Sequence, residues 1–410
     1  MNPVSIVTIK NKIPLFKGEE EASSIELIEL EEVGYELVAN KSLYKIGDKA
    51  VLIQPDYNLS DISLFESFLR PNGQENKSML GKVEGLPRRI RAKKFTLSKQ
   101  SNGDPVYSNG ILLPWKEVQA YLDANKSSIY KLSLFLNDLD LTKELGITKY
   151  EEPEIGGFGK GGARVGQIGG KFPEGVYKTD EENINNLWNH VESHIGYPVT
   201  LIGTEKIDGS SITIGVKDGK GFICSRNINK KLTINKLTGY RNKTIWESIK
   251  MWLGYKLDLG IYEETCNDDD LVKYGKPYLD VMLKYPMENW ILRGELSGGS
   301  LKGSGNKNNP ASKDKVNIKF FGLDIYHNNL SVRVSDEKFR EVLFFLSETP
   351  ERLSFEKVKT VFMQPFVSKE HLLTVSDKYF KENMIEGIVV RTLDSSFSAK
   401  VMNLEYDSKK

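Results

Sequence analysis

Short apolar runs alternate with turn signals through the first third of the chain. Four of these runs, at residues 4–9, 25–30, 35–38 and 50–53, have the length and side-chain content of strands. Gly, Asp and Asn cluster between them, as expected for turns. Several short strands at this spacing predict a small barrel or sandwich for the N-terminal region.

A strongly basic segment follows at residues 87–95, where five of nine side chains are cationic. Ile90 and Phe95 interrupt the charges, which is typical of a strand or loop that contacts a nucleic-acid backbone. A solvated basic edge strand would give the same pattern. The candidate nucleic-acid-binding residues are Arg88, Arg89, Arg91, Lys93 and Lys94.

The next segment divides the chain. Apolar spacing predicts helical structure from Trp115 to about residue 145. Residues 156–170 then include eight glycines, which indicates a flexible linker. No strand-turn-helix context surrounds these glycines, so they do not form a dinucleotide-binding fingerprint. We therefore expect an N-terminal domain over residues 1–145, a linker over 146–170 and a second domain over 171–410.

The second domain is organised around a lysine between two strands. Apolar residues 199–203 lead into Thr-Glu-Lys-Ile-Asp-Gly at 204–209, and alternation resumes at Ile212. This pattern predicts a strand, a tight turn and a second strand. A lysine withdrawn from water and set near other cations loses its proton more readily and becomes a nucleophile. Asp208 would orient the amine of Lys206 or hold a metal-bound water; a surface lysine in a polar hairpin is the alternative.

Further charged residues stand at the ends of predicted strands: Arg226, Glu295, Glu386 and Lys400. Each alone is typical of a protein surface, but in series with Lys206 they indicate one pocket. A nucleophilic lysine, further cations and acids that position Mg²⁺ through its waters suit attack on a phosphorus centre. The product of that attack is a covalent nucleotidyl-enzyme. The chain lacks the Gly-x-x-x-x-Gly-Lys-Ser/Thr sequence of P-loop proteins.

Composition narrows the remaining possibilities. Of 410 residues, 39% are apolar and 28% charged, and the formal net charge of +1 neither indicates nor excludes nucleic-acid binding. Two cysteines indicate a reducing compartment, and any metal would be a hard cation held by carboxylates, phosphates and water. We expect no secretion signal and no membrane span.

Apolar residues recur at helical spacing over residues 244–285, 336–348 and 368–382, which predicts helical structure in these three segments.

The charged positions resemble the motifs of the covalent nucleotidyltransferase superfamily of RNA ligases, DNA ligases and capping enzymes. Lys-Ile-Asp-Gly at 206–209 resembles its motif I, and Ser-Arg-Asn at 225–227 its motif Ia. Residues 294–296 resemble motif III, and residues 320–325 resemble motif IIIa. Residues 386–389 resemble motif IV, and residues 400–403 resemble motif V. Order and spacing both fit, and the likeness covers nearly the whole chain.

The likeness is strongest to ATP-dependent RNA ligases with an N-terminal OB domain, the Deinococcus-type nick-sealing group. It implies an α+β fold, with an OB-like β-barrel followed by a nucleotidyltransferase domain of antiparallel sheets flanked by helices. It also implies no C-terminal OB domain and no motif VI. We expect an intracellular monomer, cytoplasmic or, in a eukaryotic host, nuclear or organellar, with RNA or an RNA-containing nicked duplex as its partner. No protein or membrane partner is implied.

The resemblance implies three steps with ATP and Mg²⁺ or Mn²⁺ as cofactors. Lys206 attacks the α-phosphate of ATP to form lysyl-AMP, AMP passes to a 5′-phosphate end, and a 3′-OH attacks that end and seals the strand. By resemblance, Glu295 and Glu386 contact the ribose of the nucleotide or the metal-bound waters, and Asp208 supports the water shell of the metal. Lys400 touches the α-phosphate.

The resemblance also implies which residues bind the nucleotide. Thr204 and Glu205 meet the adenine edge, partly by backbone, and Arg226 contacts the nucleotide or the RNA end. Motif IIIa departs from the family pattern, because Leu323 stands where an aromatic residue usually stacks on adenine. Leu323, or Phe321 on the same strand face, would make that contact here.

Two other classes of function remain open at this point. A GTP-dependent capping-type transferase or a DNA ligase would use the same lysine, although the missing motif VI argues against both. A non-catalytic OB-containing RNA-binding protein with a degenerate transferase domain is the second alternative. The charged residues retained together argue against it: Lys206, Asp208, Glu295, Glu386 and Lys400.

Overall fold

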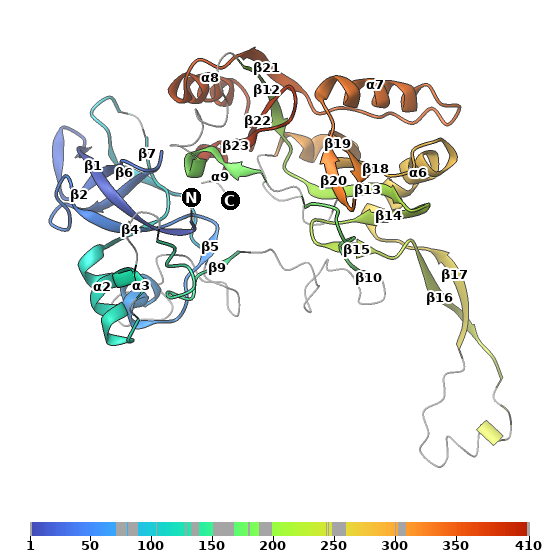
Figure 1. Cartoon of the computed structure of the whole chain (residues 1–410), viewed down its shortest axis with the longest axis horizontal. Coiled ribbons are helices and arrows are strands. Elements are labelled where there is room, and N and C mark those ends of the chain that lie inside the picture. Colours follow the sequence, from blue (N-terminus) through green and yellow to red (C-terminus); the bar gives the residue numbers. More distant parts are fainter. Residues whose placement is uncertain are drawn as a thin grey trace.

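The computed structural model describes most of the chain. The described residues are 2–70, 80, 89–103, 105–127, 129–132, 139–150, 168–178, 181–187, 199–242, 244, 246–247, 260–299, 301 and 309–407. The fold is α+β, with sheets that are mostly antiparallel. Figure 1 shows the N-terminal strands on one side, the later sheets on the other, and the short helix α9 (Leu404–Asp407) between them.

The N-terminal region is built on one seven-stranded sheet. Its longest strand is β1 (Val4–Lys17). Residues 4–8 of this strand pair with β4 (Lys49–Ile53), and residues 9–17 pair with β2 (Glu20–Leu30). The strands are β1 (Val4–Lys17), β2 (Glu20–Leu30), β3 (Glu36–Asn40), β4 (Lys49–Ile53), β6 (Lys93–Lys99), β7 (Pro105–Ser108) and β8 (Ile111–Pro114). The four strands expected over residues 4–53 are therefore confirmed. The closer assignment of this sheet to the OB type stays a prediction.

Residues 4–9 of β1 are buried on both faces, because this part of the sheet is covered on two sides. Val4 and Ile6 pack in a core shared with the helices, whereas Val7 and Ile9 pack on the opposite face with Leu37. The remaining elements here are η1 (Ser63–Phe65), α1 (Glu66–Leu69), α2 (Trp115–Ala124), α3 (Ile129–Leu132) and the pair β5 (Tyr57–Asn58) and β9 (Thr148–Lys149).

The helix expected from Trp115 to about residue 145 is shorter than predicted. Helix α2 ends at Ala124, because Asn125 closes the last turn and Lys126 adopts a left-handed conformation with φ of 59°. The chain then forms the short helix α3 and reaches β9. Most of the predicted linker, residues 151–167, lies outside the described residues.

The second region contains two larger sheets. One has seven strands: β10 (Ile168–Lys171), β15 (Ile228–Lys230), β14 (Lys220–Cys224), β13 (Ser210–Lys217), β18 (Trp290–Ser297), β19 (Asn317–His327) and β20 (Leu330–Arg333). The other has five: β11 (Glu182–Asn183), β23 (Ser398–Met402), β22 (Gly387–Thr392), β12 (Thr200–Lys206) and β21 (Thr360–Pro365). The short helices η6 (Ile184–Leu187) and η7 (Pro310–Lys313) lie in the connections.

Helices cover the outer faces of these sheets. Helices α6 (Asp270–Lys284) and α7 (Asp336–Ser347) share a core with β13, β18 and β19, and α8 (Lys369–Glu382) shares a second core with β12, β22 and β23. The serines before α7 and α8 cap them: Ser335 accepts a hydrogen bond from the Lys338 N–H, and Ser368 from the His371 N–H. Both helices expected at residues 336–348 and 368–382 are confirmed.

The prediction of helical structure over residues 244–285 is wrong in its middle part. Residues 260–266 form β17 (Gly260–Cys266), which pairs with β16 (Thr233–Tyr240) as a ribbon projecting from the body (Figure 1). Ile261, Tyr262 and Thr265 are β-branched or aromatic, which suits a strand. Helix α6 begins only at Asp270, where the Asp269 side chain accepts from the Leu271 N–H.

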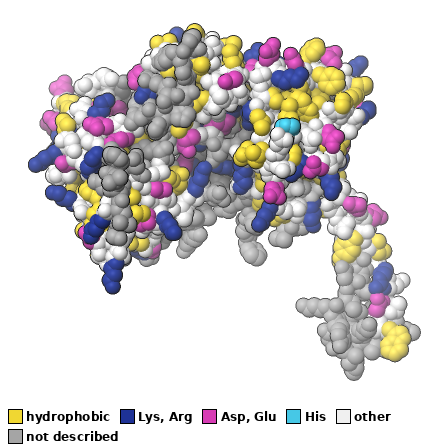
Figure 2. Space-filling model, viewed as in Figure 1, with side chains coloured by type: hydrophobic (Ala, Val, Ile, Leu, Met, Phe, Trp, Pro, Cys, Tyr) yellow, Lys and Arg dark blue, Asp and Glu magenta, His cyan; other side chains and the backbone are white. Residues whose placement is uncertain are grey.

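Hydrogen bonds are among the contacts that connect the N-terminal region with the second region. The Tyr35 hydroxyl donates to Asn186 Oδ1 at 2.7 Å, and the Gly34 N–H donates to the Asn185 carbonyl. On the face drawn in Figure 2, basic and acidic side chains are interspersed over both regions. Among the helices of the described residues, none has the length and apolar content that a membrane span requires.

Candidate active site

Lys206 stands at the end of β12, between β22 and β21 in the five-stranded sheet. Side chains alternate along this strand, and Leu201 enters the core beneath α8. Thr204 pairs with Val389, and Val389 pairs with Lys400 on the next strand. The register therefore places Thr204, Lys206 and Lys400 on one face of the sheet, opposite the core.

Glu295 comes from the other sheet. On β18, Leu292 and Leu296 enter the core beneath α6, so Glu295 lies on the opposite face, paired in register with Ser211 of β13. The turn between β12 and β13 requires a glycine, because a Cβ at Gly209 would lie 2.5 Å from the Leu296 carbonyl oxygen. This close approach brings the lysine-bearing turn against the strand that carries Glu295.

Carboxylates surround the Lys206 amine. Its Nζ lies 2.6 Å from Glu386 Oε2. Burial alone would lower the pKa of Lys206, but Glu386, Glu295 and Asp208 outweigh burial and raise it above its usual value. The prediction that neighbouring cations activate this lysine is therefore wrong for the ligand-free protein, in which Lys206 is an ammonium ion.

Glu295 experiences the opposite effect. Burial raises the pKa of Glu295 to about 8, and Glu386, Asp208 and Glu181 contribute in the same direction against the opposing influence of Lys206. Several carboxylates thus share one small region with the Lys206 ammonium. Such an arrangement favours the binding of an additional cation.

The donor set fits a hard divalent cation. Asp208, Glu295 and Glu386 supply only oxygen atoms, which Mg²⁺ and Mn²⁺ prefer. Within the described part of the chain, no three acidic, His or Cys side chains converge closely enough to hold a metal ion directly. The three carboxylates therefore suit a metal held through its waters and through the phosphates of a nucleotide.

Two residues that the sequence did not indicate hold Asp208 in place. The Tyr406 hydroxyl donates to Asp208 Oδ2 at 2.7 Å, and Asn309 Nδ2 donates to the Asp208 carbonyl at 2.6 Å. Tyr406 is fully buried and Asn309 nearly so. No spacing rule links either residue to Asp208, and only the proximity of Tyr406 to Lys400 in the sequence could have drawn attention to it.

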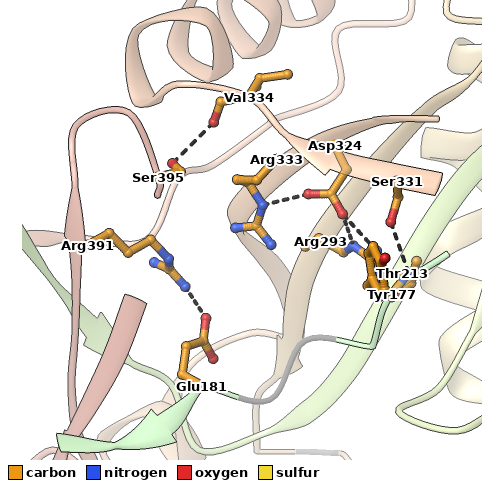
Figure 3. A network of polar contacts seen from close by, with 10 residues as sticks. All are labelled: Tyr177, Glu181, Thr213, Arg293, Asp324, Ser331, Arg333, Val334, Arg391 and Ser395. Carbon is orange, nitrogen blue, oxygen red and sulfur yellow. Dashed lines mark hydrogen bonds and ion pairs between the residues drawn. The ribbon is translucent and has the colours of Figure 1, made fainter. Parts of the chain in front are cut away.

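A buried arginine cluster supports the seven-stranded sheet that carries Glu295 (Figure 3). Arg293 donates to Asp324 Oδ2 through Nε at 3.0 Å and Nη2 at 2.7 Å, and to Thr213 through Nη1 at 3.0 Å. Arg333 binds the other oxygen of Asp324 at 2.5 Å. These bonds tie β13, β18, β19 and β20 together on the sheet face that also carries Glu295.

Arg391 lies beside the candidate base-binding residues. It forms an ion pair with Glu181, and its guanidinium lies 5.7 Å from the centre of the Phe321 ring. Thr204, Phe321, Leu323 and Arg391 help to line a cavity of about 20 Å³, enough for about one water. The base contacts predicted for Thr204, Phe321 and Leu323 stay predictions.

Glu205 and Arg226 are placed differently from the other candidates. The Glu205 carboxylate accepts from the Tyr379 hydroxyl at 2.6 Å and lies 3.4 Å from Lys359 Nζ, so its side chain faces α8 rather than Lys206. This placement does not support a base contact by the Glu205 side chain. Arg226 is exposed in the turn between β14 and β15.

The basic segment is only partly available to a nucleic acid. Arg88 lies outside the described residues. Arg89 pairs with Asp56 at 2.6 Å and stacks over Tyr150, so it has a structural role.

The rest of the segment is closer to solvent and to the site. Arg91 and Lys93 are exposed. Lys94 lies 3.7 Å from Glu405 of α9, beside the tyrosine that binds Asp208. This end of the basic segment therefore adjoins the active site.

Comparison with known proteins agrees with this geometry. Residues 199–402 match the family model described as RNA ligase. Similar solved structures include a Naegleria gruberi RNA ligase variant with ATP and Mn, at 20% identity and a TM-score of 0.66, covering 99% of this chain and 98% of that chain. No curated protein matches the chain in sequence.

Two further solved structures show the same fold. A variant of the Naegleria gruberi ligase with AMP and Mn has 21% identity and a TM-score of 0.65, covering 100% of this chain and 98% of that chain. An apo variant of the same Naegleria gruberi ligase has 21% identity and a TM-score of 0.64, covering 100% of this chain and 99% of that chain. The fold and site define an enzyme of the nucleotidyltransferase kind. Residues 199–402, just under half of the chain, match the RNA ligase family, and this match makes the protein an enzyme with an RNA ligase region.

Proposed function

We propose that this protein is an ATP-dependent RNA ligase that seals 3′-OH/5′-phosphate breaks through lysyl-AMP and an adenylylated 5′ end. The observation that carries the proposal is the placement of Lys206 at the end of β12, 2.6 Å from Glu386 and close to Glu295 and Asp208. The match to the RNA ligase family and the likeness to structures with ATP and Mn and with AMP and Mn support it.

The first step requires Lys206 to lose its proton. When bound, Mg²⁺ or Mn²⁺ would supply positive charge beside the three carboxylates and the phosphates. With those carboxylates neutralised, the interaction that raises the pKa of Lys206 is removed, and burial then favours the neutral amine. The amine attacks the α-phosphorus of ATP, a nitrogen–phosphorus bond forms, and pyrophosphate leaves as the bond to its oxygen breaks.

The second and third steps transfer the nucleotide and seal the strand. A 5′-phosphate oxygen attacks the lysyl-AMP phosphorus, and Lys206 leaves and regains its proton. A 3′-OH then attacks the activated 5′-phosphorus, loses its proton and displaces AMP. Lys400, on the same sheet face as Lys206, would neutralise charge on the α-phosphate in each step.

The proposed substrate is a nicked duplex that contains RNA, bound by a monomer. The N-terminal sheet, which we propose to be of the OB type, presents Arg91 and Lys93 to solvent and Lys94 beside α9. Cations along such a surface hold a phosphate backbone. The 5′ end would then lie within reach of Lys206.

A sealing assay tests the substrate and the reaction. The full-length protein is incubated with ATP, Mg²⁺ and a 5′-labelled nicked duplex, with RNA or DNA on either side of the nick. We expect sealing when the 3′-OH strand is RNA, and an adenylylated 5′ strand when the 3′-OH is replaced by a 3′-deoxy end. Sealing of DNA alone would indicate a DNA ligase. Transfer of GMP to a 5′-diphosphate end would indicate capping chemistry.

A further inference from the structure

The short helix α9 is fixed to the segment that carries Glu386. Asn403 directly precedes this helix, and its Oδ1 accepts from the N–H groups of Glu405 at 3.1 Å and Tyr406 at 3.4 Å. Its Nδ2 donates to the Ile385 carbonyl at 3.0 Å, and its N–H donates to the Glu386 carbonyl at 2.9 Å. The position of Tyr406 relative to Glu386 is therefore set by four hydrogen bonds.

Tyr406 reaches from this helix to the turn after Lys206. Its side chain is fully buried, and its hydroxyl donates to Asp208 Oδ2 at 2.7 Å across 198 residues of sequence. We propose that Tyr406 is a positioning residue that orients the Asp208 carboxylate toward the waters of the bound divalent cation. The inference rests on the proposed function and assigns a role to a residue outside its motifs.

The geometry gives the hydroxyl a specific task. A hydrogen bond from a phenol to a carboxylate is charge-assisted, and it selects one rotation of the carboxylate among those that the free side chain would sample. Asn309 holds the main-chain carbonyl of Asp208 at 2.6 Å, so that the main chain and the side chain of this residue are both held. Groups that hold metal-binding carboxylates in this way typically affect metal affinity by about 10- to 100-fold.

The substitution Tyr406→Phe tests this role, because it keeps the buried ring and removes only the hydroxyl. Mn²⁺ binding is measured from the electron paramagnetic resonance signal of free Mn²⁺, using full-length protein with an ATP analogue whose α–β bridge is a methylene. We expect Mn²⁺ binding to weaken on the order of 10-fold. The Mg²⁺ concentration that half-saturates adenylylation of Lys206 rises by the same factor, and the rate recovers at saturating Mg²⁺.

Tyr130→Phe is the matched control. It also removes a tyrosine-to-aspartate hydrogen bond, to Asp123 at 2.6 Å, but in the N-terminal region. We expect this variant to bind Mn²⁺ as the wild-type protein does. A weakening equal to that of Tyr406→Phe would contradict the proposal.

A double-mutant cycle separates positioning from structural support. In an Asp208→Ala background, Tyr406→Phe should no longer change Mn²⁺ affinity, because its target carboxylate is absent. An equal effect in both backgrounds, or unchanged affinity in the single variant, overturns the inference. Failure of the wild-type protein to form an AMP adduct would instead contradict the proposed function itself.

Discussion

Binding of the metal and nucleotide should release a proton from Glu295. Burial and neighbouring carboxylates raise the pKa of this residue to about 8, so about 90% of it is protonated at pH 7 and about 10% at pH 9. A carboxylic acid offers metal-bound waters a poorer acceptor than a carboxylate does. Occupancy of the site must therefore displace the proton, and release should reach about 0.9 proton at pH 7 and about 0.1 at pH 9.

The sign of the linked pH dependence follows from the same shift. Below pH 8 the ligand-free site holds a proton that binding must remove, so the apparent affinity for Mn²⁺ rises with pH. Release of one proton changes the apparent Mn²⁺ affinity by about tenfold, or about 1.4 kcal/mol, for each pH unit below the pKa of Glu295. Above pH 8 the proton is already absent, and the contribution from Glu295 levels off.

Isothermal titration calorimetry in buffers of different ionisation enthalpy measures the released protons. Mn²⁺ and the methylene-bridged ATP analogue are titrated into the wild-type protein and into Glu295→Gln, which cannot release this proton. The wild-type protein should release more protons than Glu295→Gln, and this difference should fall from about 0.9 proton at pH 7 to about 0.1 at pH 9. Glu288→Gln, an exposed change just before β18, is the matched control. Equal proton release from wild type and Glu295→Gln at pH 7 would refute the reasoning.

Three further predictions concern the scaffold, the basic surface and the turn. Arg293→Ala removes both hydrogen bonds to Asp324 Oδ2 and leaves this buried aspartate with Arg333 on its other oxygen. It should lower the free energy of unfolding by about 3 kcal/mol, measured with urea; a loss below about 1 kcal/mol would show that the cluster is not supporting the sheet. Arg91→Glu combined with Lys93→Glu should leave adenylylation of Lys206 intact but weaken RNA binding. The dependence of RNA affinity on salt concentration should fall by the equivalent of about two phosphate contacts; an unchanged dependence would show that this surface does not bind RNA. Gly209→Ala should abolish the AMP adduct, because its Cβ would lie 2.5 Å from a main-chain oxygen, and an active variant would show that the turn can shift.

The strand, turn and strand around Lys206 could be predicted because the signal is local. The apolar run before Thr204 and the alternation after Gly209 match β12 and β13 to within a few residues. The electrostatic environment of Lys206 could not be predicted in the same way. It depends on the pairing of β12 with β22, which brings Glu386, 180 residues away in the sequence, to the lysine.

Other misses have similar physical causes. The apolar spacing between residues 245 and 253 favours a helix, but the strand character of Ile261 and Tyr262 and the cap at Asp269 decide where α6 begins. Glu205 is adjacent to Lys206, and strand alternation turns its side chain to the opposite face of the sheet. Tyr406 belongs to no motif, since its role arises from packing between distant segments.

Intact mass after incubation with ATP and Mg²⁺ tests the central claim most directly. The wild-type protein should gain the mass of one AMP, and Lys206→Ala should gain nothing. A parallel incubation with GTP should give no adduct. Absence of an adduct in purified wild-type protein that is not already adenylylated, or an AMP adduct that persists in Lys206→Ala, would contradict the assignment of Lys206 as the nucleophile.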